Sequence, residues 1–450
     1  MTAEPRIIRT EAEQAIVQQH EDELSGLPGG ERVRSIRAAA FDKFRRAGLP
    51  HRRIEEYKYT DLRALMKRAA PPARRPVETA AAKAAREGAD PLAGVNRYRV
   101  VLVDGHYFDA LSDRTALEAA GVDVVSARDA LAGDGEPASL LLATPEMAAG
   151  DIALALNAAF ATDGVSVHVR KGVALDRPLE IQHVLTAGEP RSATVRNRVV
   201  IGAGASVQVI ETYRGPAAIA HQVNAVTEVA VGRDATLGYV RLQAEGDAAQ
   251  HLGATLLSLS PAARVDHLTV TAGAALSRQQ MFVTTGGEHA RLGINAAGMI
   301  GGRQHADMTL LIDHALGGAY TRVLAKNVVD DDAGGVFQGK IIVEPDAQKT
   351  DAKMMAKSLL LSPTAEFDSK PELEIFADDV QCGHGATSGR MDDTQLFYLM
   401  TRGVPRAEAD RLLIEAFLDE AIDAVSDERL AAALRAVVTH WLEKRGNARP

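Results

Sequence analysis

The sequence predicts a mainly β fold with helices at both ends, and three observations support this fold class. From Val165 onward, apolar and polar residues alternate, which is typical of strands with one buried face. Helical periodicity is almost absent from there to about residue 380. A short turn-like segment also recurs roughly every 30 residues in this region. These segments begin at Gly202, Gly232, Ser260 and Gly287, with a weaker one at Gly318.

Repetition at this interval favours a solenoid for the β region. Each unit has a Gly or Ser turn, a small alanine and then alternating apolar residues, so it offers one apolar face that only a stacked neighbour can cover. A β-helix or β-solenoid meets this requirement. An antiparallel sandwich with a turn every dozen residues or so is the alternative, and the repeat favours the solenoid.

The expected domain order is an N-terminal helical domain with a linker (1–150), a β-helix core (151–385) and a helical C-terminal domain (386–450). This division rests on the helical spacing of apolar residues and on the Gly and Pro residues at the ends of the expected helices. The expected N-terminal elements are helices over 31–46, 61–68 and 152–161, a strand over 98–103 and a linker over 76–94. The expected C-terminal helices begin near Asp392, at Pro405 and at a Ser426 cap.

Composition excludes several classes of protein. The net charge of −9 gives no cationic excess for nucleic acid. The first residues lack an apolar core typical of a secretory signal, and charged residues interrupt the most apolar stretch, so we expect neither export nor membrane insertion. Cys382 is the single cysteine, which fits a reducing compartment. We therefore expect a cytoplasmic protein.

Two apparent catalytic motifs fail on chemical grounds. Residues 334–341, GGVFQGKI, imitate a phosphate-binding loop, but Ile341 replaces the magnesium-binding Ser or Thr, and a strand pattern follows where a helix is needed. Acidic pairs such as Asp331 and Asp332 are better explained by turns and helix caps. We expect no bound nucleotide and no enzyme activity. A β-helix enzyme acting on carbohydrate is the catalytic alternative, and an aromatic content of 4% weighs against it.

One pair of residues has the chemistry of a metal site. Cys382 lies two residues before His384, and glycines flank the histidine on both sides. Both side chains are competent ligands for soft metals, although a buried cysteine beside a surface histidine would look the same in sequence. An iron-sulfur cluster usually needs four ligands, mostly thiolates, so this chain could only share one with another subunit. We expect most of the histidines of the β region to lie at the surface or in turns; they are His183, His221, His267, His289, His305 and His314.

The region around this pair resembles a known family. Residues 370–387, KPELEIFADDVQCGHGAT, closely resemble the C-terminal signature of the SufD-type members of the SufB/SufD family, which belongs to the Suf system of iron-sulfur cluster assembly. Two departures are Glu344, where many members have histidine, and Gly383, which replaces a common serine. The other segments that are similar to the family are 55–63, 342–351, 359–362, 396–399 and 402–403.

This resemblance implies a right-handed parallel β-helix between helical domains, in a non-catalytic scaffold subunit. It also implies two partners, a SufB-like paralogue held through the β-helix and a SufC-like ABC ATPase held through the C-terminal helices. Such a complex aids iron acquisition and the assembly of nascent clusters. The sequence leaves open whether the isolated chain forms a homodimer.

The resemblance also assigns residues. The functional histidine of the family falls on His384 and its neighbouring cysteine on Cys382, which implies transient iron or an iron-sulfur cluster shared with a partner subunit. The SufB-type scaffold is the runner-up, but residues 55–63 and the lone thiol favour the SufD type. The residues expected to hold the ATPase are Leu396, Phe397, Tyr398, Leu399, Arg402, Gly403, Leu412 and Phe417.

Overall fold

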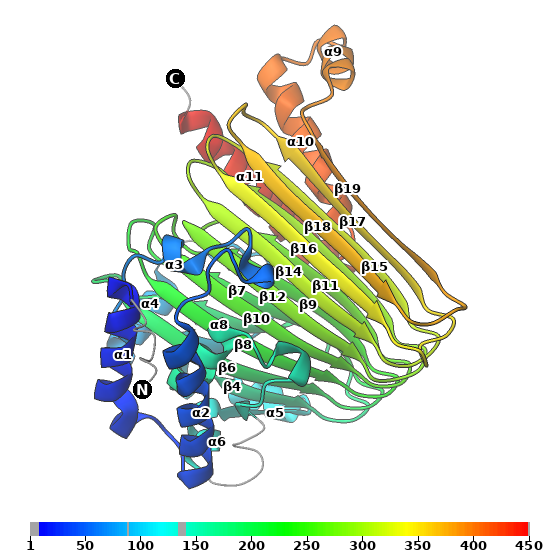
Figure 1. The fold of residues 1–450 in the computed structure, drawn as a ribbon. Coiled ribbons are helices and arrows are strands. Elements are labelled where there is room, and N and C mark those ends of the chain that lie inside the picture. Colours follow the sequence, from blue (N-terminus) through cyan, green and yellow to red (C-terminus); the bar gives the residue numbers. More distant parts are fainter. Residues whose placement is uncertain (1–8, 88–89, 134–140, 449–450) are drawn as a thin grey trace, which may run out of the picture.

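Two facing sheets form a long β-solenoid in the computed structural model, which describes residues 9–87, 90–133 and 141–448 (Figure 1). From β4 onward successive strands alternate between the sheets, so each coil contributes one strand to each. The strands are β1 (Tyr98–Val103), β2 (His106–Tyr107), β3 (Val122–Ser126), β4 (Val165–Val169), β5 (Leu179–Val184), β6 (Ser192–Ile201), β7 (Ser206–Arg214), β8 (Gln222–Val231), β9 (Thr236–Ala244), β10 (Gln250–Leu259), β11 (Arg264–Thr271), β12 (Leu276–Thr285), β13 (Arg291–Ile300), β14 (His305–His314), β15 (Tyr320–Val329), β16 (Gly334–Val343), β17 (Asp351–Leu360), β18 (Glu366–Ile375) and β19 (Gln381–Gly389).

The pairing is parallel throughout the repeating part. The odd-numbered strands from β5 to β19 join β1 and β2 in a ten-stranded sheet, and the even-numbered strands from β4 to β18 join β3 in a nine-stranded sheet. Only the β1–β2 and β3–β4 pairs are antiparallel among the described strands. The predicted mainly β solenoid with helical ends is confirmed, and the antiparallel sandwich is excluded.

The recurring turns connect the even-numbered sheet to the odd-numbered one. In each turn the residue before the small alanine has positive φ: Gly204, Asp234, Ala262, His289 and Gly318. The following alanines point into the core and are at most 1% exposed: Ala205, Ala235, Ala263, Ala290 and Ala319. A Cβ on Gly287 would lie 2.0 Å from the backbone nitrogen of Pro261, so stacked turns leave no room for a side chain there. Gly318 is the positive-φ residue of its turn and not the first residue, so the weak repeat predicted to begin at Gly318 begins two residues earlier, at Leu316.

Most of the N-terminal helices lie against the nine-stranded sheet, whereas α4 packs on β1 of the ten-stranded sheet. They are α1 (Glu11–Glu23), α2 (Glu31–Ala47), α3 (Leu62–Leu65), α4 (Glu78–Arg86), α5 (Arg114–Ala119), α6 (Ala127–Ala132) and α8 (Ile152–Phe160). The sequence missed α1, and the helix predicted over 61–68 is the four-residue α3. Two parts of the sequence predictions lie outside the described residues. They are residues 1–8, at the start that was expected to lack a secretory signal, and residues 88–89 of the predicted linker. The boundary at residue 150 stays a prediction, because β1 and β3 already belong to the sheets.

Residues 55–61, named here the 55–61 segment, bind across successive strands of this sheet. The carbonyl of Glu56 accepts hydrogen bonds from Arg278 on β12 (2.7 Å) and from Gln338 on β16 (3.2 Å). The Thr60 hydroxyl donates to Asp307 on β14, which also forms a buried ion pair with Arg278. The motif shared with the SufD type is thus a clamp on the solenoid.

The C-terminal helices are α9 (Asp393–Thr401), α10 (Arg406–Ile422) and α11 (Glu428–Ala448). The apolar faces of α10 and α11 pack on the outer face of the ten-stranded sheet, where Leu418 and Leu434 contact a cluster that includes Val270. Asp427, and not the predicted Ser426, caps α11, since its carboxylate accepts hydrogen bonds from the backbone of residues 429 and 430. No helix of the described residues combines the length and apolarity that a bilayer crossing needs.

The interior of the solenoid contains a charged network. Glu211 accepts hydrogen bonds from the hydroxyls of Tyr213 and Tyr239, both at 2.7 Å, and pairs with Arg241 at 3.0 Å. Arg241 in turn donates to Nε2 of His251 (2.7 Å). These cationic and hydrogen-bonding neighbours hold the pKa of Glu211 well below its usual range against the effect of burial. A buried charge is tolerated only with such partners.

Most of the histidines predicted to lie at the surface are buried, so that prediction is wrong. His183, His221, His267 and His314 are at most 6% exposed, while His289 does lie in a turn. Alternation along a strand cannot tell an inward histidine from an outward one when both faces carry polar residues. Burial lowers the pKa of His267 to about 3 and that of His314 to about 4.

Substituting Arg278→Ala is expected to lower the free energy of unfolding by about 3 to 5 kcal/mol, because Asp307 would remain buried and unpaired. Urea denaturation of the full chain measures the change. Arg303→Ala, at an exposed turn, is the control and should stay within about 0.5 kcal/mol. An equally small loss for Arg278→Ala would contradict this account of the clamp.

Stability should fall as the pH drops from about 7 to about 5, because His267 and His314 stay neutral when folded but take up protons when unfolded. Each contributes roughly 1 to 2 kcal/mol to the change. His267→Phe, which retains the stacking on Tyr239, should flatten the pH dependence measured by urea denaturation. His289→Asn, at a turn position with positive φ, should leave the slope unchanged. Equal slopes for the native chain and His267→Phe would contradict the prediction.

Candidate functional site

The final coil of the solenoid has open edges. β19 pairs only with β17, and β18 pairs only with β16, so each is the last strand of its sheet. The outward backbone groups of an edge strand are free to pair with another strand. Apolar side chains accompany this edge, since Ile375 at the end of β18 is 42% exposed and the following Phe376 is 60% exposed. This end of the molecule has the features of a docking surface.

Cys382 and His384 lie on this edge strand. They pair in register with Ala352 and Met354 of β17, whose side chains belong to the solenoid core. Because alternate residues share a face, the thiol and the imidazole both lie on the row that faces the interior, at its open end. Cys382 is half-buried against the core and His384 is exposed. Burial raises the pKa of the Cys382 thiol.

This pair is not a complete metal site in one chain. No group of three or more His, Cys, Asp or Glu side chains able to hold a metal ion occurs among the described residues. A thiol, which binds metal after losing its proton, and an exposed imidazole can each supply one ligand. The arrangement can complete a site only if another chain brings donors to the same edge.

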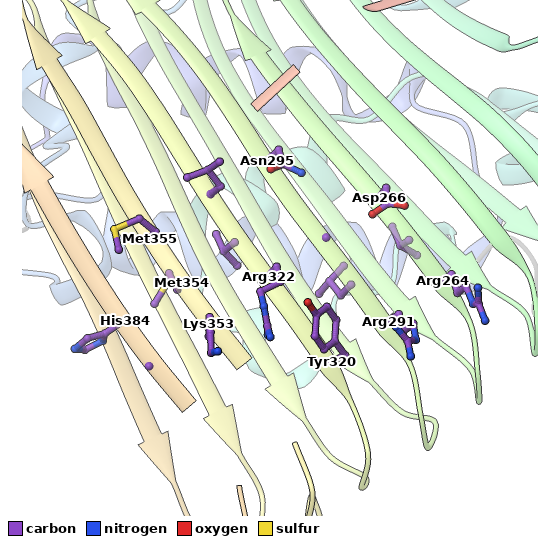
Figure 2. A pocket seen from close by; sticks show the side chains of 16 residues that line it. Arg264, Asp266, Arg291, Asn295, Tyr320, Arg322, Lys353, Met354, Met355 and His384 are labelled. Atoms are coloured by element: carbon purple, nitrogen blue, oxygen red, sulfur yellow. The ribbon is translucent and has the colours of Figure 1, made fainter. Parts of the chain in front are cut away.

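A groove crosses the outer face of the ten-stranded sheet and reaches the same edge strand (Figure 2). Its volume is about 730 Å³, and it extends from β11 to β19. Figure 2 shows His384 at one end and Arg264 at the other, with Tyr320 between them. Gly383, which pairs in register with Lys353, forms part of its lining.

Cationic side chains line this groove, named here the basic groove. Successive strands supply Arg264, Arg291, Arg322 and Lys353. The guanidinium of Arg322 lies 3.9 Å from the ring centroid of Tyr320 and pairs with Asp351 at 2.7 Å. Asp266 is the carboxylate within the lining, and burial raises its pKa. The groove therefore carries an excess of positive charge.

Sequence reasoning missed this groove, although a signal for it existed. Arg264, Arg291 and Tyr320 directly follow the turn alanines of three successive repeats. Aligning the repeats would have stacked these residues in one column on the outer face.

The C-terminal residues predicted to hold a partner divide into exposed and packed ones. α9 projects beyond the solenoid (Figure 1), with Phe397 69% exposed and Tyr398 56% exposed. Leu396 is buried, and Phe417 packs under Lys326 with its ring 4.2 Å from the Lys326 amine. The remaining predicted residues that are exposed are Arg402, Gly403 and Leu412, and Leu399 is half-buried.

A parallel β-solenoid with helical ends and a donor pair on an open edge strand is an architecture suited to assembly with a second chain. The comparisons with known families agree. A model described as the SufBD core domain of the SUF system for FeS cluster assembly matches residues 183–417, and a model of the SufBD protein N-terminal region matches residues 18–181. The chain belongs to the SufBD family of the Suf system of iron-sulfur cluster assembly.

Individual relatives support the same conclusion. The iron-sulfur cluster assembly protein SufD of Escherichia coli is 33% identical over 389 residues, which are 86% of this chain and 87% of that protein. An iron-sulfur cluster assembly SufBD family protein of Synechocystis is 29% identical over 446 residues, 95% of this chain and 93% of that protein. The resemblance to SufD predicted from the sequence is confirmed.

Proposed function

We propose that this chain is a non-catalytic scaffold subunit of the SufD type that joins a SufB-like paralogue and a SufC-like ABC ATPase. At the interface with the paralogue, His384 and secondarily Cys382 contribute ligands to iron or to a nascent iron-sulfur cluster. The observation that carries this proposal is the position of both donors on the edge strand β19, which pairs with β17 on one side and is open on the other. The chain itself binds no nucleotide, and the cytoplasm stays the predicted compartment.

The open end favours a partner that continues the solenoid. An exposed parallel edge with apolar neighbours is an aggregation risk unless something covers it. A paralogue with the same coil geometry can pair with β18 and β19 and bury Ile375 and Phe376 at the same time. A second copy of this chain would fit by the same argument, which is the homodimer that the sequence left open for the isolated chain.

Sharing the cluster follows from the donor count. One thiol and one nearby imidazole are fewer than the ligands that a cluster usually needs. A site divided between two subunits opens when they separate, which suits the release of a nascent cluster. His384 is the stronger candidate ligand because it is exposed, whereas Cys382 is half-buried with a raised thiol pKa.

The ATPase is assigned to α9 and the start of α10. The exposed rings of Phe397 and Tyr398 project from a helix that is otherwise anchored by Leu396. Exposed aromatic residues of this kind often provide the main binding energy of an interface. The packed residues Leu396 and Phe417 would act by positioning these helices.

His384→Ala is expected to lower the iron and acid-labile sulfide of the complex by about half or more, because one ligand of the shared site is lost. The chain is co-expressed anaerobically with its SufB-like and SufC-like partners, and the purified complex is analysed. His289→Asn, an exposed turn histidine, is the matched control and should retain native iron. Equal iron and sulfide in the native and His384→Ala complexes would contradict a ligand role for His384 and leave only a structural role.

Replacing Phe397 and Tyr398 together by alanine should weaken retention of the ATPase about tenfold or more, since aromatic anchors of an interface are lost. Binding is measured by titrating the purified SufC-like subunit onto the full chain. Val77→Ala, at a position 70% exposed on the N-terminal side, is the control. Both variants should unfold at the same urea concentration as the native chain. Unchanged affinity of the Phe397 and Tyr398 double variant for the SufC-like subunit would refute this assignment.

A further inference from the structure

We propose that the basic groove is a docking surface for an extended acidic segment of another polypeptide chain, about five residues long or longer. The groove lies on the outer face of the ten-stranded sheet, whereas the side chain of His384 belongs to the inward row of β19. The proposal is therefore separate from the ligand role of His384. It assigns a partner chemistry to a surface that cluster assembly at the open edge does not use.

Three cations of the groove are available to a ligand. Arg264, Arg291 and Lys353 are exposed, and none of them forms an ion pair with a carboxylate of the described residues. Arg322, by contrast, is neutralised by Asp351 at 2.7 Å. The surface therefore presents unpaired positive charge, which attracts a segment of opposite charge.

The spread of these cations determines the length of the ligand. They lie on β11, β13 and β17, and the groove crosses these strands (Figure 2). Three strand spacings of about 4.8 Å separate β11 from β17, so the outer cations are roughly 14 Å apart. An extended chain advances about 3.4 Å per residue and points alternate side chains the same way. A segment of about five residues therefore spans the cations, and its first, third and fifth side chains face the groove.

The hollow of the groove is shaped for a narrow ligand. Its floor contains Gly293, where a Cβ would lie 2.6 Å from the carboxylate of Asp266. Arg291 and Asn295, on either side of Gly293 along β13, point the same way and border this floor. Their backbones are about 13 Å apart along the strand, and their side chains occupy part of that width. A helix, which is about 10 to 12 Å wide with its side chains, is too broad for the remaining space, whereas an extended segment fits.

The strands under the groove favour recognition by side-chain charge. β13 and β15 are paired on both sides, so they have no free backbone groups to which a further strand could add. The ring centroid of Tyr320 lies 3.9 Å from the guanidinium of Arg322 and 5.6 Å from that of Arg291. This stacking orients both guanidinium groups before a ligand arrives, which lowers the entropy lost on binding. Clustered arginines recognise acidic motifs in this way.

The groove suits an acidic protein segment better than a nucleic acid. Single-stranded nucleic acid is held by a continuous row of cations together with several aromatic rings. Among the described lining residues, Tyr320 supplies one phenol ring, and Asp266 places a carboxylate between the cations. The chain as a whole has a net charge of −9. A segment with acidic residues at alternate positions can pair with the cations and leave an uncharged residue beside Asp266.

The test measures fluorescence anisotropy of a labelled, end-capped heptapeptide titrated with the full chain. The probe alternates serine and glutamate, with glutamate at its second, fourth and sixth positions. The comparison heptapeptide has the same composition with its three glutamates adjacent, so its carboxylates cannot reach both ends of the groove when it is extended. We expect the alternating peptide to bind about fivefold more tightly, and added salt to weaken its binding.

Substitutions in the groove should change the affinity in opposite directions. Arg264→Gln with Lys353→Gln should weaken binding of the alternating peptide about tenfold. Asp266→Asn, which removes the negative charge from the lining with little change in shape, should strengthen it about threefold. The matched control is Lys67→Gln with Arg303→Gln, two exposed cations outside the groove, and it should bind as the native chain does. All these variants should unfold at the same urea concentration as the native chain, because the substituted side chains are exposed.

Absence of binding of the alternating peptide to the native chain would overturn the inference. Equal affinity for the two acidic peptides would also overturn it, because it would indicate general charge attraction only. Equal affinity in the groove and control variants, or tighter binding of an oligothymidylate of the same length, would have the same consequence. The proposed function fails separately, through the iron content of the His384→Ala complex. That variant should bind the peptide as the native chain does, because the imidazole lies on the inward row.

Discussion

Parallel pairing of stacked coils is the constraint on which the rest of this structure depends. Every coil satisfies the backbone of its neighbours, so the pairing can end only where a coil is missing. At the N-terminal end the antiparallel strands β2 and β3 complete the two sheets. At the other end β18 and β19 remain open. The donor pair Cys382 and His384 lies on that edge, so the chemistry of the protein is placed where a second chain can reach it.

The interior of the solenoid explains why the coils hold one register. A slip of one residue would turn Glu211 and Arg241 outward and carry apolar side chains into the network. Buried charges contribute little net stability, but they penalise any packing in which they lose their partners. The clamp of residues 55–61 acts in the same way on the outer face, since Arg278 and Asp307 satisfy each other and the segment only in this register.

The outer face of the ten-stranded sheet has an apolar region and a cationic region. Where α10 and α11 lie, the outward residues are apolar, as Val270 and Leu242 are. Beyond these helices the outward residues of β11 to β17 become cationic and form the basic groove. A groove of this kind could not be covered by an apolar helix without burying unpaired charge. Its exposure beside His384 is therefore built into the sequence of the strands.

Much of this protein was determined by its sequence alone. Alternation and the repeat predicted the solenoid, since each coil contacts only its neighbours and local pattern suffices. The residues around Cys382 and His384 predicted the family and the donor pair. The sequence could not decide which residues face inward, so the buried histidines and the network around Glu211 were missed. Only the stacking of coils placed Arg264, Arg291, Arg322 and Lys353 in one groove, because residues about 30 positions apart become neighbours across strands.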